Sequence, residues 1–146
     1  MESALLFLEK KKPFHPDRFL DFVKNKFPKN IIRSKGLFWI ASRSDQALIW
    51  SSAGGSIKTD PAGVWWDSMS FSERINYPSF VDNQKEIESE WSLDYGDRKI
   101  ELVFIGQKLD VSSIVNQLEE CMLNEKELIK FKKGEFQKND SWPIER

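Results

Sequence analysis

Apolar residues recur at two different spacings along the chain, and each spacing predicts a different element. Two segments have the spacing of a helix with one buried face, one after Pro16 and one after Asp110. We predict that the first helix begins at Pro16, where the missing N–H costs nothing, and that Pro28 ends it. The side chain of Asp110 suits the N-cap of the second helix. The buried stripe of this second helix is expected to comprise Val111, Ile114, Val115, Leu118 and Met122.

Short apolar runs bounded by turn residues predict four or five strands. We expect these strands at residues 4–8, 31–40, 47–50, 57–59 and 99–106. Gly36 lies inside the second run, which indicates either a bulge or the close approach of another backbone. The turn residues at 60–63 are expected to end the short fourth strand.

The order of these elements predicts an α+β fold. We expect a two-layer sandwich in which an antiparallel sheet of four or five strands carries two main helices on one face. The polar stretch 67–90 has poor periodicity and is expected to be a surface excursion. We assign residues 1–130 to one domain and residues 131–146 to a C-terminal tail, which Trp142 is expected to dock onto the domain.

Composition narrows the class of protein. The chain has 146 residues, which favours a single domain, and its 6 Trp, 11 Phe and 2 Tyr predict an aromatic core. The net charge is −1, whereas nucleic-acid-binding domains usually have a pI above about 9. No apolar run approaches the roughly 18 residues of a membrane span, and we see no secretion signal. We therefore expect a cytoplasmic protein that binds neither nucleic acid nor membrane.

Residues with metal-binding or nucleophilic chemistry are few. One Cys and one His exclude an internal disulfide and cannot alone supply the four ligands of a structural zinc site. His15 is either a helix cap or packing residue, a metal ligand, or a catalytic base, and Cys121 is either a core residue or a reactive thiol. The acidic side chains between Glu86 and Asp97 form either a solvated edge or a cation or acid–base site. The glycines near residue 54 lack the Gly-Lys-Ser/Thr of a phosphate-binding loop, so we expect no nucleotide site there. Because no catalytic triad or metal cluster is visible either, we expect no enzyme.

Two adjacent tryptophans, Trp65 and Trp66, supply the best candidate for a partner contact. Neighbouring side chains on extended backbone point to opposite sides, so both cannot enter one core. We expect one indole in the core and the other on the open side. There it would be covered by the 67–90 excursion, by a second copy of the chain or by a partner domain.

Seven blocks of sequence resemble a known family. They are Pro13-Phe14-His15-Pro16-Asp17-Arg18-Phe19, Arg33 to Arg43, Ser52 to Gly55, Asp60 to Trp66, Gly96 to Arg98, Glu101 to Gly106 and Cys121 to Leu123. In order and spacing these blocks are similar to those of the CobW C-terminal domain family.

The resemblance implies a domain that normally follows a P-loop GTPase domain with a Cys-x-Cys-Cys metal motif. Such proteins act as metallochaperones for zinc or cobalt, and some take part in cobalamin biosynthesis. The GTPase part is absent from this sequence, so the resemblance implies no catalytic residue here. The chain is either a domain of a longer protein or a stand-alone copy.

The expected role is therefore non-catalytic, in partner recognition or assembly. The expected partners are a GTPase domain of the same or a separate chain, a client metalloprotein, or a second copy, with Trp65 and Trp66 as contact residues. The alternative is an autonomous carrier that binds zinc or cobalt weakly through His15, in metal homeostasis or cobalamin metabolism. No cofactor is expected to be required.

Overall fold

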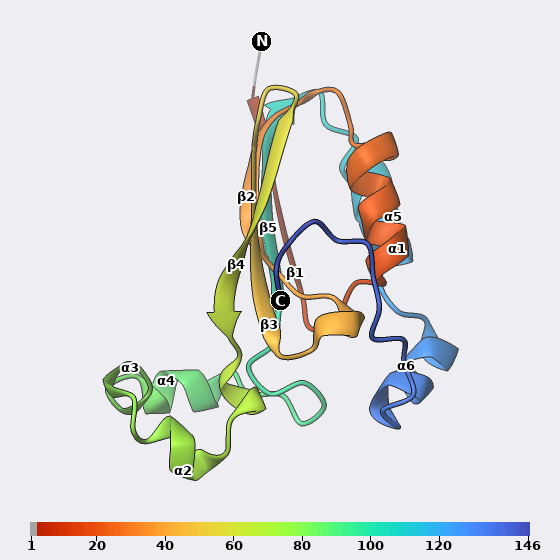
Figure 1. Cartoon of the computed structure of the whole chain (residues 1–146). Coiled ribbons are helices and arrows are strands. Elements are labelled where there is room, and N and C mark those ends of the chain that lie inside the picture. Colours follow the sequence, from red (N-terminus) through yellow and green to blue (C-terminus); the bar gives the residue numbers. More distant parts are fainter. Residues whose placement is uncertain (1–2) are drawn as a thin grey trace.

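Five antiparallel strands form one sheet in the order β1-β5-β2-β3-β4 (Figure 1). The computed structural model describes residues 3–146, and Met1 and Glu2 of the expected domain lie outside the described residues. The strands are β1 (Ser3–Lys10), β2 (Ile31–Phe38), β3 (Gln46–Ala53), β4 (Ser56–Val64) and β5 (Ile100–Gln107). The last strand along the chain thus lies inside the sheet, between the first and the second.

Helices form the second layer. Two main helical segments, α1 with η1 and α5, cover one face of the sheet, and the opposite face carries no helix (Figure 1). This arrangement confirms the expected α+β two-layer sandwich. The helices are α1 (Pro16–Asp21), the π-helical η1 (Phe22–Lys26), the 3-10 turns η2 (Ala41–Arg43) and η3 (Trp66–Ser68), α2 (Phe71–Arg74), α3 (Pro78–Val81), α4 (Gln84–Ser89), α5 (Val111–Glu120) and α6 (Glu125–Lys132). No helix within residues 3–146 is long and apolar enough to cross a bilayer.

The core lies between these layers and is rich in aromatic side chains. Strand β5 alternates strictly, and its side chains Ile100, Leu102 and Phe104 are fully buried on the helix side. Phe14 and Phe19 stack with their ring centroids 3.7 Å apart, and further rings join them. This core agrees with the aromatic core that the Phe and Trp content predicts.

Gly36 marks a close approach of backbones rather than a bulge. It lies between Leu102 on β5 and Trp50 on β3, and a Cβ at this position would overlap the carbonyl oxygen of Glu101. The missing side chain therefore makes room for the backbone of β5 at Glu101 and Leu102 and for the Leu102 side chain. The register shift of β2 lies elsewhere, between Ile31 and Arg33.

The expectation that residues 60–63 end the fourth strand is wrong. Strand β4 continues to Val64, and a register shift opposite Ala47 and Leu48 accommodates the extra residue. Because β4 is the edge of the sheet, Pro61 interrupts no ladder on its outer side, and Gly63 takes the φ of 131° that the shift needs.

Two expectations for the C-terminal part also need correction. Val111 is 44% exposed, so it does not belong to the buried stripe, whereas Ile114 and Leu118 are buried as predicted. The fading apolar pattern concealed the helix α6, which begins with a capping box of Asn124 and Glu127. A helix capped in this way forms even when its apolar face is short.

Candidate functional site

The excursion between β4 and β5 is a small helical unit held to the sheet by Asp97 and Arg98. The carboxylate of Asp97 accepts the backbone N–H groups of Trp66 and Asp67, both at 2.9 Å. Arg98 pairs with Asp67 and donates to the Ser44 carbonyl at 2.6 Å. The block Gly96-Asp97-Arg98, which carries part of the resemblance, therefore anchors the excursion to the sheet.

Trp65 and Trp66 point to different environments, as the adjacency argument predicts. Trp65 is 5% exposed and belongs to the core, where its indole N–H has no partner within residues 3–146. Trp66 is half-buried under the excursion, with ring centroids 5.2 Å from Phe80 and 5.8 Å from Tyr77. The excursion thus covers Trp66 within this chain. A partner contact at Trp65 or Trp66 stays a prediction.

The excursion exposes several apolar side chains. Arg74 ties the excursion together, because it donates to the Trp66 carbonyl at 2.8 Å and stacks on Trp91 at 4.6 Å. Four large apolar side chains of the excursion are about half exposed, namely Phe71, Ile75, Tyr77 and Val81. Such a grouping on a small, anchored unit is typical of an interaction surface.

His15 is the N-cap of α1. Its Nδ1 accepts the backbone N–H of Asp17 at 3.2 Å, and its Nε2 lies 3.7 Å from Glu127. Burial, together with nearby Arg18, lowers the pKa of His15. Because Nδ1 is the acceptor, the neutral ring carries its proton on Nε2, which leaves no free ligand atom. Within residues 3–146 no three His, Cys, Asp or Glu side chains gather as a metal site, and zinc or cobalt binding at His15 stays a prediction.

The remaining candidates are the Cys121 thiol and the acidic side chains between Glu86 and Asp97. Cys121 is buried, its thiol donates to the Arg18 carbonyl, and burial raises its pKa to about 11, so it is protonated at neutral pH. Glu86, Glu88 and Glu90 are exposed on the excursion, whereas Asp97 is the anchor described above. The acidic stretch therefore does not converge on one point.

A carboxylate that the sequence reasoning missed ties α6 to α1. Arg18 donates to both oxygens of Glu127, at 2.7 and 2.8 Å, and to the carbonyl of Met122. Hydrogen bonding from Arg18 is the main reason that the pKa of Glu127 is held at about 2. The carboxylate of Glu127 is thus charged in the folded chain at neutral pH.

This ion pair predicts a loss of stability in acid. Because the folded-state pKa of Glu127 is lowered, its contribution is complete above the ordinary value of 4.5 and is lost as the pH falls towards 2. We expect the variant Glu127→Gln to be less stable than the parent at neutral pH, and the difference to shrink across this window. Urea unfolding at several pH values measures it. A difference that stays constant with pH would contradict the assigned pKa.

Another ion pair, which is buried, holds the C-terminal segment to the domain. The side chains of Arg43 and Asp140 are 5% and 0% exposed and are joined by two hydrogen bonds, at 2.8 and 3.1 Å. Arg43 also donates to the carbonyls of Trp142 and Ile144, and Ser42 donates to Asp140. Burial opposes the ionisation of Asp140, but the hydrogen bonds from Arg43 and Ser42 outweigh it and lower the pKa.

The docking of this segment confirms the prediction for Trp142. Its indole is buried in the aromatic core and donates to the carbonyl of Pro16 at 2.8 Å. Although residues 131–146 are expected to form a tail, they contribute Trp142 and Ile144 to the core. Helix α6 also continues past the expected boundary at residue 130. The boundary itself stays a prediction.

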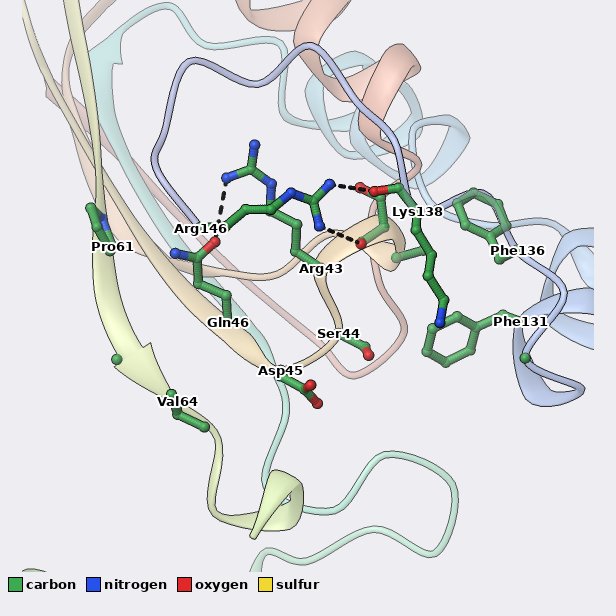
Figure 2. Close-up of a pocket in the computed structure, with 14 residues that line it drawn as sticks. Arg43, Ser44, Asp45, Gln46, Pro61, Val64, Phe131, Phe136, Lys138 and Arg146 are labelled. Atoms are coloured by element: carbon green, nitrogen blue, oxygen red, sulfur yellow. Dashed lines mark hydrogen bonds between the residues drawn. The ribbon is translucent and has the colours of Figure 1, made fainter.

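The docked segment also closes one side of a pocket of about 640 Å³ (Figure 2). Figure 2 shows Pro61 and Val64 on the β4 side and Phe131, Phe136 and Lys138 on the opposite side. Four separate stretches of chain line the pocket, so no local sequence motif predicts it.

Comparisons with known proteins agree with this architecture. Residues 4–122 match the family described as the cobalamin synthesis protein cobW C-terminal domain. "Zinc-regulated GTPase metalloprotein activator 1" of Dictyostelium discoideum is 34% identical over 122 residues, which are 82% of this chain and 25% of that protein. "Zinc chaperone Rv0106" of Mycobacterium tuberculosis is 30% identical over 129 residues, covering 87% of this chain and 31% of that protein.

The solved structure of Zn(II)-bound YjiA GTPase from E. coli has the same fold. It superposes with a TM-score of 0.58 at 14% identity, over 83% of this chain and 30% of that one. The chain thus spans about a quarter to a third of the length of these relatives. The match over residues 4–122 shows that the chain belongs to the CobW C-terminal domain family.

Proposed function

We propose that this domain is a non-catalytic recognition module that binds a CobW-type GTPase domain during zinc delivery. Family membership supports the proposal, as do the names of the relatives, a zinc-regulated GTPase metalloprotein activator and a zinc chaperone. The first of these proteins is named a GTPase and is about four times as long as the matched part, which is consistent with a GTPase domain and a domain like this one in a single chain.

The observation that carries the proposal is the group of exposed apolar side chains on the excursion. Four half-exposed side chains lie on α2 and α3 or at the ends of these helices. Asp97 and Arg98 hold this unit to the sheet. Phe71 and Ile75 are four residues apart, so they lie on the same side of the chain's helical turn. Rigid apolar side chains bind a partner at a small cost in conformational entropy.

The test is a binding titration with a separately expressed GTPase domain. The partner is the GTPase domain of a CobW-family protein from the same organism, loaded with GTP or GDP, and calorimetry measures the Kd. We expect the double variant Phe71→Ser and Ile75→Ser to weaken binding by about tenfold or more, which is typical for removing interface anchors. Both side chains are half exposed, so the fold should tolerate the change.

The matched control is Val111→Ser, which replaces another half-exposed apolar residue, on the helix layer. The control should bind like the parent. Equal affinity of the parent, the double variant and the control would contradict the excursion as the contact surface. The absence of any binding by the parent would contradict the GTPase domain as its partner. Sedimentation of the chain alone tests self-association.

A further inference from the structure

The pocket beside the C-terminal segment combines apolar walls with a lysine, Lys138, that has no ion-pair partner within residues 3–146. Its volume of about 640 Å³ lies within the roughly 300–1,000 Å³ that is usual for small-molecule sites. Apolar side chains line two opposite walls, with Val64 and Pro61 on β4 and Phe131 and Phe136 on the other side (Figure 2). The lining includes three positive side chains, Arg43, Lys138 and Arg146, against one acidic side chain, Asp45.

Not all three positive groups are available to a ligand. The five N–H groups of Arg43 all have acceptors, namely both oxygens of Asp140, the Gln46 side chain and the carbonyls of Trp142 and Ile144. Arg43 is therefore part of the wall. Asp45 faces Arg98 at 3.7 Å, so its charge is partly balanced as well.

Lys138 is the lining cation that remains. Within residues 3–146, Lys138 has no carboxylate within ion-pair distance, and its side chain extends along the Phe131 side of the pocket (Figure 2). Arg146 is 54% exposed, and its guanidinium already donates to Asp140 and to the carbonyls of Ser42 and Lys138. The pocket thus has one positive charge without an ion-pair partner in residues 3–146, that of Lys138, next to two aromatic rings.

We propose that this pocket binds a small amphipathic anion. The apolar body of the ligand lies between Val64 and the rings of Phe131 and Phe136, and its carboxylate, sulfonate or phosphate group lies at Lys138. The site is separate from the excursion surface, so its occupancy can be measured without a GTPase domain.

The test compares two fluorescent probes that differ in charge. Anilinonaphthalene sulfonate carries a sulfonate on the same rings that N-phenylnaphthylamine has without it. Titrated into the 146-residue chain, the sulfonate probe should bind about tenfold more tightly, and added salt should weaken its binding alone because exposed charges are screened. Backbone amide NMR shifts caused by the sulfonate probe should centre on Gly63, Val64, Gly134 and Phe136.

Two pairs of variants locate the site. Lys138→Gln should weaken the sulfonate probe about fivefold, the size of one exposed charge pair, while Lys126→Gln on α6 should have no effect. Val64→Glu places a negative charge in the pocket at a residue that is 55% exposed and should abolish binding, whereas Leu5→Glu, at a residue that is 65% exposed on β1, should not. Equal binding of the two probes, equal effects within either pair of variants, or shifts centred elsewhere would overturn the proposal.

Discussion

Replacing Arg43 by methionine should lower the free energy of unfolding by about 3–5 kcal/mol, because the carboxylate of Asp140 would stay buried without its partner. The loss should exceed that of an ordinary ion pair, since Arg43 also holds the carbonyls of Trp142 and Ile144. Without these bonds, the segment that inserts Trp142 into the core is released. Urea unfolding, followed by tryptophan fluorescence, measures the change.

The double variant Arg43→Met and Asp140→Leu separates charge burial from packing. Removing both charges avoids an uncompensated one, so the double variant should be more stable than Arg43→Met alone. Arg33→Met is the control, because Arg33 is exposed on β2 and its loss should change stability by no more than about 0.5 kcal/mol. If Arg43→Met behaved like Arg33→Met, the ion pair would not be what fastens the C-terminal segment.

The two adjacent tryptophans should respond very differently to truncation. Trp65→Ala removes an indole that is 95% buried in the main core, and we expect a loss of about 3–5 kcal/mol in unfolding free energy. Trp66→Ala removes a half-buried indole that packs on Tyr77 and Phe80. This change should loosen the excursion more than the sheet, because the contacts of Trp66 lie in the excursion.

Unfolding and limited proteolysis together distinguish these effects. Trp66→Ala should expose residues 67–90 to cleavage under conditions where the parent resists, at a smaller cost in global stability than Trp65→Ala. Phe80→Ala is the matched variant, since Phe80 is the ring against which Trp66 packs, and it should give the same cleavage pattern. Equal destabilisation by Trp65→Ala and Trp66→Ala, with no new cleavage, would contradict the separate environments.

Local patterns sufficed to predict most of the fold. Strict alternation in β5 and the stripe of Ile114 and Leu118 in α5 each reflect a single buried face, so the spacing alone identifies them. The adjacency of Trp65 and Trp66 correctly predicted two different environments, although Trp66 begins the 3-10 turn η3 and does not continue an extended segment. Pro61 misled the reasoning, since a proline ends a central strand but is tolerated at an edge, and the sequence does not say which strand lies at the edge.

The candidate sites were harder to predict than the fold. The partners Arg43 and Asp140 are 97 positions apart, and nothing in either neighbourhood points to the other. The pocket is made where β4, η2, α6 and the C-terminal segment meet, so it exists only in three dimensions. His15 was the one imidazole and drew attention for its chemistry, yet its place before Pro16 made it a helix cap.

The position of β5 between β1 and β2 has a consequence for how the chain folds during synthesis. Strand β1 has β5 as its sheet neighbour, and Leu5 pairs with Ile105. A ribosome that adds 5–20 residues per second needs roughly 5–20 s to make the intervening 100 or so residues. During that time the apolar run Leu5-Leu6-Phe7-Leu8 has no strand to pair with, while β2, β3 and β4 can already form a meander. The nascent chain therefore exposes β1 as an unpaired apolar strand, which is prone to aggregate. We expect a chaperone, or a domain made before β1, to cover this strand until β5 emerges.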